Sequence, residues 1–294
     1  MRPGRASDLP QLLELWQDEV REGRQDVVPS EARLRRSLEN LDWESKSRIA
    51  EGADGRIIGS VLVTGRPTPE GLNTTLYVAG APGALEELVR WGVQLSRATG
   101  ATAAHLFRAK GRGKPLASVG MHIVRPWWRM DRSLLDTLPE VKPVGGYRLI
   151  DGLGAEAGSW GAAFNRSFGD HWRFSPHNEV GILSGRTPPL CLAALSSEDG
   201  TPAAITFGEV ERYKDDPRPQ PVGLVSHVGT VPEHRRRGLA IWLVAECLVR
   251  LRAAGARHVS LYVDGWNQTR AFDAYRKLGF EVVFETEVWE ATFP

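Results

Sequence analysis

The chain has 294 residues, 41% of them hydrophobic and 25% charged, which is the composition of a soluble globular protein of one large or two ordinary domains. Its formal net charge of +1 provides no overall attraction to nucleic acids or to anionic membranes, so we predict neither as a partner. The first residues lack the apolar core of a secretory signal, and no run of about 18 apolar residues could span a membrane. We therefore predict a cytoplasmic protein.

The first half of the chain shows a hairpin followed by a helix and two more strands. Residues 49–63 predict two strands joined by a turn at Asp54 and Gly55. Residues 87–107 predict an amphipathic helix that ends at Gly100 and leads into an apolar strand. Residues 116–124 predict the end of a helix, a glycine and another strand.

The second half repeats these features in the same order. The matching segments are residues 192–207, 243–263 and 275–283. This predicts two copies of one α/β unit, with chance similarity between α/β segments as the alternative. Because residues 136–146 are rich in proline and glycine, we place a linker there and predict domains at 1–138 and 147–294. Each domain is expected to be a mixed central sheet flanked by helices.

The two cysteines lie in apolar segments of the second half. Cys191 falls in a strand-like run and Cys247 in a helix-like run. Both are expected to be small core residues, and no disulfide is predicted.

A basic loop precedes a long apolar helix in the second half. Residues 222–231 predict a strand, and the three arginines 235–237 and Gly238 follow before the helical pattern begins. A helix start offers unpaired N–H groups and a positive dipole end, and both favour a phosphate. Gly238 and the small Ala240 leave room for a ligand close to the main chain. The alternative is a solvated basic cap.

This loop resembles the acyl-CoA loop of the GNAT superfamily of N-acetyltransferases. The family pattern is Arg or Gln, two residues, Gly, any residue, then Gly or Ala. The matching residues are Arg235, Arg236, Arg237, Gly238, Leu239 and Ala240. The resemblance implies acetyl-CoA as cosubstrate, bound by this loop and by the main chain of Val228, Gly229 and Thr230. For Gly229 a β-bulge is the alternative explanation.

A second GNAT-like signature follows in residues 256–283. Its asparagine and its A…Y.K.GF helix correspond to Asn267 and to the helix that carries Tyr275. The resemblance implies that Asn267 contacts the pantetheine arm and that Tyr275 lies near the thioester sulfur. A phenol in that place can protonate the leaving thiolate, whereas the alternative for Tyr275 is an ordinary amphipathic-helix position.

The general base and the acceptor site are less sharply defined. An attacking ammonium must lose a proton, and the candidate bases are His227, Glu209 and Glu211. In the family, the segment that corresponds to residues 164–180 lines the acceptor site. Its candidate acceptor-binding residues, which could equally close the core, are Asp170, His171 and Trp172.

The first copy departs from the GNAT pattern. Residues 72–91 lack the arginine that starts the loop motif, and Leu116 stands where Tyr275 stands in the second copy. We therefore expect a degenerate amino-terminal domain and place the chemistry in the carboxy-terminal one. The basic loop at 109–115 is expected to be solvated.

The tandem layout resembles the mycothiol synthase branch of GNAT proteins, which acetylates a cysteinyl amine on a glucosamine-inositol. Leu224 stands where that branch has an acidic residue, so the sequence does not fix the same acceptor. We expect direct attack of a small-molecule primary amine on acetyl-CoA, without a metal, by a monomer or homodimer. A protein N-terminus is another acceptor class, and a non-catalytic acyl-CoA-binding or structural tandem module is the alternative function.

Overall fold

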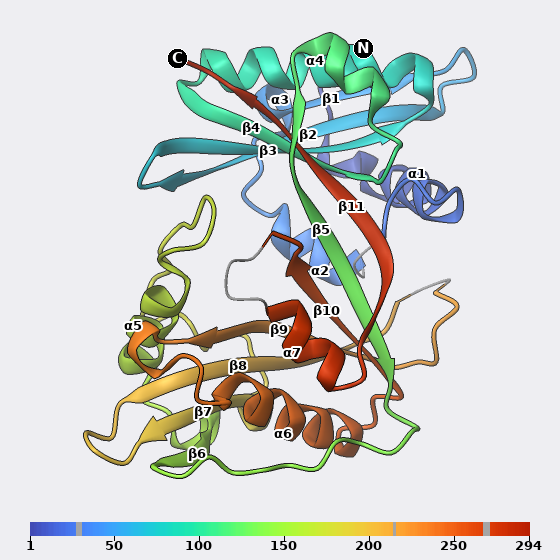
Figure 1. The fold of residues 1–294 in the computed structure, drawn as a ribbon. Helices are drawn as coiled ribbons and strands as arrows, with labels where there is room; N and C mark the ends of the chain where they lie inside the picture. The colour runs from blue at the N-terminus through green and yellow to red at the C-terminus, as the bar shows by residue number, and fades with distance from the viewer. Residues whose placement is uncertain (28–30, 214–215, 267–270) are drawn as a thin grey trace. The chain divides into compact units, whose positions relative to one another are not determined.

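The computed structural model describes residues 1–27, 31–213, 216–266 and 271–294 (Figure 1). The chain divides into two compact units. Unit 1 comprises Met1–Trp127 and Phe284–Pro294, and unit 2 comprises Trp128–Val283. The carboxy-terminal segment thus belongs to unit 1, although the second repeat encodes it. The domain limits expected from the sequence, 1–138 and 147–294, stay a prediction.

Unit 1 is a mixed sheet between helices. Its helices are α1 (Leu9–Arg21), α2 (Glu31–Ser37), α3 (Trp43–Lys46) and α4 (Pro82–Ala98), with short 3-10 turns at Ala6–Asp8 and Lys114–Val119. Its strands are β1 (Ser47–Glu51), β2 (Ile57–Thr68), β3 (Gly71–Gly80), β4 (Ala101–Ala109) and the later part of β11 (Glu281–Thr292). They lie in the order β1-β2-β3-β4-β11. β3 and β4 are parallel, whereas β1 and β2, β2 and β3, and β4 and β11 pair antiparallel.

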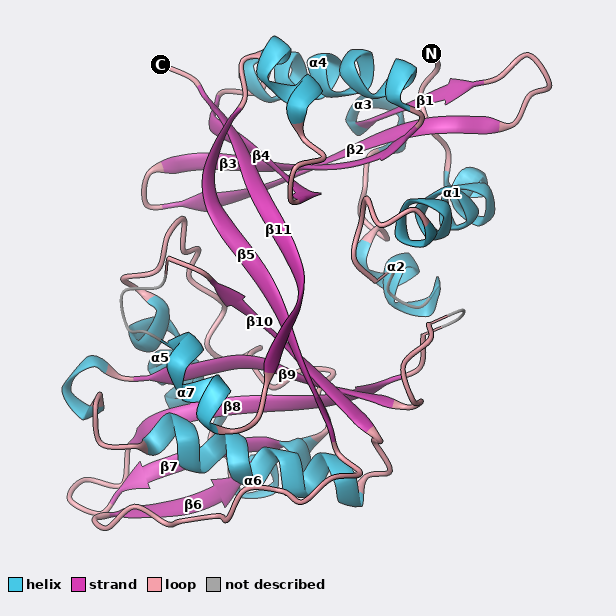
Figure 2. Ribbon diagram, turned by 45° about the vertical axis from the view of Figure 1, so that its right-hand side comes forward, coloured by secondary structure: helices cyan, strands magenta, loops and turns pink. Residues whose placement is uncertain are grey.

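Alternating side chains of the unit 1 strands supply two cores. Val61 and Val63 of β2 pack with α4 on one face, whereas Leu62 between them packs with Leu9 of α1 on the other. Figure 2 shows α4 and α1 on opposite faces of this sheet. The turn predicted in residues 49–63 and the helix stop at Gly100 are confirmed.

Unit 2 has the same architecture. Its helices are α5 (Ala157–Phe168), α6 (Leu239–Ala253) and α7 (Ala271–Lys277), with 3-10 turns at Gly152–Gly154, Pro188–Leu190 and Pro232–His234. Its strands are the later part of β5 (His122–Ser133), β6 (Tyr147–Asp151), β7 (Cys191–Ser196), β8 (Pro202–Glu211), β9 (Val222–Thr230) and β10 (His258–Asp264). They lie in the order β5-β10-β9-β8-β7-β6, and β9 and β10 are parallel.

The faces of the unit 2 sheet pack against α6 and α5. Leu192 of β7 joins the α6 core, and the neighbouring Cys191 joins the core under α5. At Gly208 of β8, a Cβ would lie 2.9 Å from Sγ of Cys247, so glycine allows α6 to approach the sheet closely. Cys191 and Cys247 are both buried and free.

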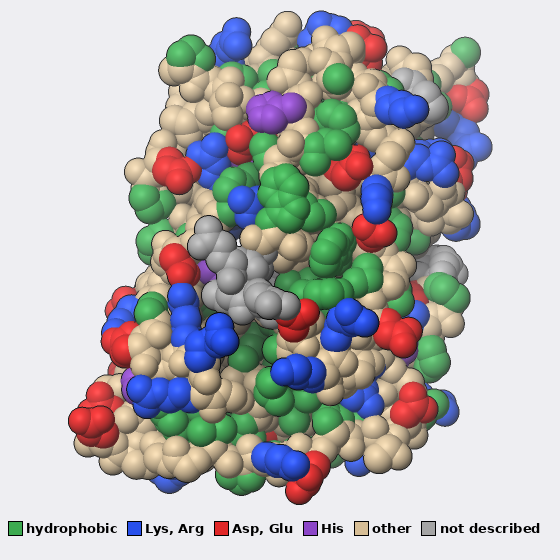
Figure 3. Space-filling model, in the orientation of Figure 1, with side chains coloured by type: hydrophobic (Ala, Val, Ile, Leu, Met, Phe, Trp, Pro, Cys, Tyr) green, Lys and Arg blue, Asp and Glu red, His purple; other side chains and the backbone are tan. Residues whose placement is uncertain are grey.

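The two repeats run through the same elements in the same order. In each, a hairpin leads to a third strand, a helix and a parallel strand, and then to a left-handed glycine before a long strand. The predicted α/β class with mixed sheets is therefore confirmed. None of the described helices is long and apolar enough to cross a membrane. On the face drawn in Figure 3, Lys and Arg lie among Asp and Glu rather than forming one continuous basic surface.

Candidate functional site

Strands β9 and β10 of unit 2 start side by side and then part. Their parallel pairing ends at Val225 and Leu261 among the described residues, although β9 extends to Thr230 and β10 to Asp264. On its other edge β9 stays paired with β8 as far as Thr230. The fork therefore presents one edge of β9 with main-chain groups that can hydrogen-bond an extended ligand.

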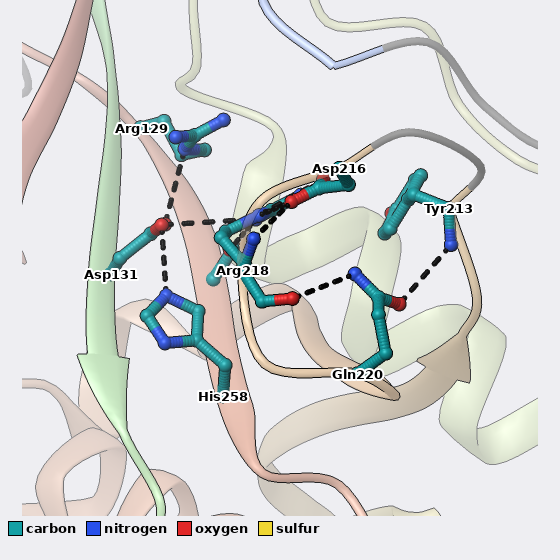
Figure 4. Close-up of polar contacts among 8 residues, drawn as sticks. Arg129, Asp131, Tyr213, Asp216, Arg218, Gln220 and His258 are labelled. Atoms are coloured by element: carbon teal, nitrogen blue, oxygen red, sulfur yellow. Dashed lines mark hydrogen bonds and ion pairs between the residues drawn. The ribbon is translucent and has the colours of Figure 1, made fainter.

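A buried ion cluster holds the closed end of this fork (Figure 4). Asp131 of β5 lies 3.0 Å from Nε2 of His258 and 3.7 Å from Nη1 of Arg218. Arg218 also donates to Oγ of Ser260 at 2.5 Å, which ties the segment before β9 to β10. Burial raises the pKa of Asp131, but His258 and the arginines more than offset it, so the pKa is lowered overall. Paired charges thus hold β10 to β5 and to the segment before β9 at the closed end of the fork.

His227 forms a bulge in β9 at the open end of the fork. Thr206 pairs with Val228 and Phe207 pairs with Ser226, so His227 is the extra residue. Its φ of +58° is a left-handed conformation that costs a non-glycine residue about 1 kcal/mol. The residue as a whole keeps surface exposed to solvent, and four rings lie within 6.3 Å of the imidazole. The four rings belong to Phe164, Phe168, Phe207 and His177.

These surroundings keep His227 neutral. Burial of the imidazole among the rings, together with the charges of Arg186 and His177, lowers the pKa of His227 to about 4. At neutral pH the imidazole can therefore accept a proton, although as a weaker base than an unperturbed histidine.

Glu209 lies beside the same bulge. Its Oε1 accepts hydrogen bonds from Oγ of Ser226 at 3.0 Å and from Nη1 of Arg186 at 3.1 Å. The Arg186 guanidinium also covers the ring of Phe207 at 4.2 Å. Two of the candidate bases thus lie close to the bulge, whereas Glu211 pairs opposite Val222 at the closed end of the fork.

Arg235 holds the basic loop to the end of α5. Its guanidinium donates two hydrogen bonds to Asp170, at 2.6 and 3.0 Å, and one to the carbonyl of Ser167 at 3.1 Å. Its Nε donates to the carbonyl of Thr230 at 3.1 Å. This ion pair lowers the pKa of the Asp170 carboxyl. The first arginine of the motif therefore shapes the loop, and Asp170 already has a cationic partner.

The other two arginines differ from each other. Arg237 donates to the hydroxyl of Tyr147 at 2.8 Å and to the carbonyl of Glu233 at 3.2 Å. Arg236 is exposed, with φ +64°, and makes no hydrogen bond or ion pair with the described residues. Of the three guanidinium groups, that of Arg236 therefore extends into solvent at the start of α6.

The amino-terminal end of α6 is open. Gly238 caps the helix with φ +87°, and a Cβ built there would have one neighbour within 4 Å, Val144 at 3.9 Å. Leu239 is buried and Ala240 is half-buried in the first turn of the helix. Their N–H groups have no intrahelical acceptor, which suits an anion.

Gly229, on the strand before the basic loop, is required by close packing against α5. A Cβ at Gly229 would lie 2.8 Å from Cβ of Ser167 and from Phe168, so α5 requires a glycine there. Val228 and Thr230 are half-buried on the parting stretch of β9. The bulge that was the alternative for Gly229 lies at His227 instead.

The predicted acceptor segment follows α5. The His171 ring packs edge-on against Phe168 at 4.8 Å, and Trp172 is half-buried beside it. Their roles, like that of Asp170, stay predictions. The described residues bring no three His, Cys, Asp or Glu side chains close enough together to hold a metal ion.

Tyr275 lies on α7 and is 7% exposed in the core beneath α6. Its ring meets Phe280 edge-on at 6.3 Å. Burial raises the pKa of the phenol, so it stays protonated at neutral pH and can act as a donor. Asn267 lies outside the described residues.

Known proteins resemble this chain in sequence and in fold. The family described as FR47-like protein matches residues 215–289, which hold the fork, the loop and α7. A mycothiol acetyltransferase of Kytococcus sedentarius is 32% identical over 181 residues, which is 56% of each chain. The chain thus spans about half the length of the curated relatives it matches.

Solved structures resemble the chain over nearly its full length. A GCN5-related N-acetyltransferase from Sphaerobacter thermophilus superposes with a TM-score of 0.79 at 20% identity, covering 99% of this chain and 94% of that one. This chain has the GNAT fold. A tandem GNAT protein from the clavulanic acid biosynthesis pathway superposes with a TM-score of 0.70 at 16% identity, covering 100% and 98% of the two chains. The predicted resemblance to tandem GNAT proteins is therefore confirmed.

The open start of α6 leads to a first prediction. We expect Gly238→Glu to abolish binding of acetyl-CoA, measured by calorimetry, because a carboxylate would occupy the position of an anion. Gly255→Glu is the matched control, since Gly255 has a similar φ of +91° just past the other end of α6. Equal loss of affinity in both variants would show that backbone strain, not the site, was responsible.

Proposed function

We propose that this chain is a CoA-dependent N-acetyltransferase whose chemistry takes place in unit 2. The observation that carries the proposal is the fork between β9 and β10, which opens beside the unpaired N–H groups at the start of α6. A phosphate at the helix start and an extended amide-bearing arm along β9 would fit that arrangement. Acetyl-CoA carries both groups, and the FR47-like match covers this part of the chain.

The side chains at the bulge support direct transfer. The amine nitrogen of the acceptor would attack the thioester carbonyl, and the carbon–sulfur bond would break as the amide forms. His227 or Glu209 would take the proton that the ammonium loses, and Tyr275 would donate its proton to the leaving thiolate. This proposal requires the thioester to lie beside the His227 bulge and within reach of Tyr275.

The cysteines argue against a covalent acetyl-cysteine intermediate. Burial raises the pKa of Cys191 to about 11 and that of Cys247 to about 12. Both therefore remain protonated thiols, which are poor nucleophiles, in the interior of unit 2. We infer that acceptor and acetyl-CoA are bound together when transfer occurs.

The acceptor is proposed to be a small primary amine. Relatives named mycothiol acetyltransferase match half of the chain, which supports a cysteinyl amine among the candidates. Leu224 is paired with Glu209 and Ser260 in the sheet, so this position supplies no charge to an acceptor. The alternative function is an acyl-CoA-binding module without turnover. Such a module would use the same fork, but it would leave the thioester of the bound acyl-CoA intact.

A thiol-release assay with a panel of amines tests the function. We expect acetyl-CoA to yield free CoA only when an amine is added, with the acetylated amine detected by mass spectrometry. The panel should include cysteinyl amines, amino sugars and a peptide N-terminus. Tight binding of acetyl-CoA without release by any amine would support the binding module instead. No binding at all would contradict both.

Two variants can distinguish His227 from Glu209 as the general base. If His227 is the base, His227→Asn should lower kcat/KM about 10²-fold, since asparagine tolerates the left-handed bulge but removes the imidazole. The wild-type profile should then fall as the pH drops through about 4, because protonation of His227 removes the base. The exposed His122 gives the control variant His122→Asn. If Glu209→Gln shows the loss and His227→Asn does not, Glu209 is the base.

The role of Tyr275 as an acid can be tested in the same assay. We expect Tyr275→Phe to lower kcat on the order of 10²-fold, with little change in the affinity for acetyl-CoA. Tyr77→Phe is the control, because Tyr77 is an exposed tyrosine of β3. Unchanged turnover in a folded Tyr275→Phe protein would assign Tyr275 to packing alone.

A further inference from the structure

Unit 1 contains a fork of the same kind between β3 and β4. Their parallel pairing ends at Thr75 and His105 among the described residues, although β3 extends to Gly80 and β4 to Ala109. On their outer edges the two strands remain paired, β3 with β2 and β4 with β11. The main-chain groups that face into the fork therefore need partners other than a strand.

The chain that follows α1 supplies these partners. Nε2 of Gln25 donates to the carbonyl of Val78 on β3 at 3.0 Å. The N–H of Ala109 on β4 donates to the carbonyl of Arg24 at 3.3 Å. Residues 24 and 25 thus bridge the two parted strands through one side-chain amide and one main-chain carbonyl.

A buried carboxylate also occupies the fork between β3 and β4. Glu19 at the end of α1 is 0% exposed, and its Oε1 accepts a hydrogen bond from the N–H of Gly80 at 3.3 Å. Oε2 accepts from Nη1 of Arg108 on β4 at 2.8 Å, and Nε of Arg24 donates to Oε1 at 2.9 Å. Arg108 is itself 2% exposed, so this carboxylate and its two arginines form a paired cluster inside the fork.

The contacts in unit 1 fall where unit 2 would hold its ligand. Val78 lies past the last pair of its fork at Thr75, and Val228 lies past Val225 with the His227 bulge between them. Gly80 and Thr230 likewise end their strands. In unit 1 the helix after β3 begins at Pro82, which has no N–H to offer an anion. Residues 72–81, which precede it, contain no arginine.

We propose that the end of α1 permanently fills the fork of unit 1, so that each chain binds a single acyl-CoA, in unit 2. The side-chain amide of Gln25 takes the place of a ligand amide. The carboxylate of Glu19 accepts the hydrogen bond of the Gly80 N–H at the end of β3, which a ligand would otherwise reach. The count of one ligand rests on the function proposed above for unit 2. The filling of the unit 1 fork does not, because it follows from contacts within unit 1.

Hydrogen exchange of the whole protein without ligand tests the filling directly. We expect the amides of Gly80 and Ala109 to exchange at least about 10²-fold more slowly than unprotected amides, because both are bonded to the α1 end. Gln25→Ala removes the hydrogen bond to Val78 next to the Arg24 carbonyl that binds the Ala109 N–H. In this variant the amide of Ala109 should therefore exchange about tenfold faster. The control is Gln17→Ala on α1. Free exchange of both amides in the wild type would overturn the proposal.

Counting bound acetyl-CoA by calorimetry tests the consequence. We expect one molecule per chain, none for Gly238→Glu, and no change in exchange at Gly80 or Ala109 when the ligand is added. Two molecules per chain, or one retained by Gly238→Glu, would overturn the proposal while leaving CoA binding intact. If no acetyl-CoA binds to the wild type, the proposed function fails, and the exchange of the two amides still decides whether the fork is filled.

Discussion

The constraint on which the rest of this structure depends is the parting of two parallel strands. A ladder satisfies the main-chain groups of both strands, so a ladder that stops while its strands continue leaves N–H and C=O groups facing a gap. In unit 2 the gap starts beyond Val225 and Leu261, and in unit 1 beyond Thr75 and His105. Buried polar groups without partners are costly, so a fork has to be filled by ligand, solvent or the protein itself.

The side chains around each fork decide which of these applies. In unit 1 a fully buried glutamate and a glutamine from the α1 end bond to the strand groups. In unit 2 the corresponding region carries a strained histidine and an unblocked helix start. One backbone arrangement thus supports a filled fork in unit 1 and the fork proposed to bind acetyl-CoA in unit 2, and the two differ in a few polar residues.

The charge of the basic loop divides between structure and recognition. Arg235 donates hydrogen bonds to Asp170 and Ser167, and Arg237 donates one to Tyr147. These bonds fix the path of the chain into α6. Only Arg236, among the described residues of this triplet, keeps its guanidinium away from protein partners. An anion at this place would therefore be bound mainly by the helix N–H groups, with one mobile cation nearby.

Local patterns predicted the elements, whereas long-range contacts determined the site. Glycines such as Gly55, Gly100 and Gly255 mark turns and helix ends because their positive φ values are local requirements. The bulge at His227 depends on the register with β8, which no local pattern encodes. Arg186 comes from a segment without helical or strand periodicity, so its contact with Glu209 gave no sequence signal.

The path of the long strands gives the amino-terminal repeat a role even without chemistry. Residues 286–292 of β11 pair with β4 inside unit 1, where Glu290 binds Nε2 of the buried His105 at 2.6 Å. Asp131 of β5, which comes from the first repeat, holds His258 in unit 2. Each compact unit therefore contains a strand that the other repeat encodes. Removing the first repeat would take β5 and its buried carboxylate from the closed end of the unit 2 fork and leave His258 without this partner.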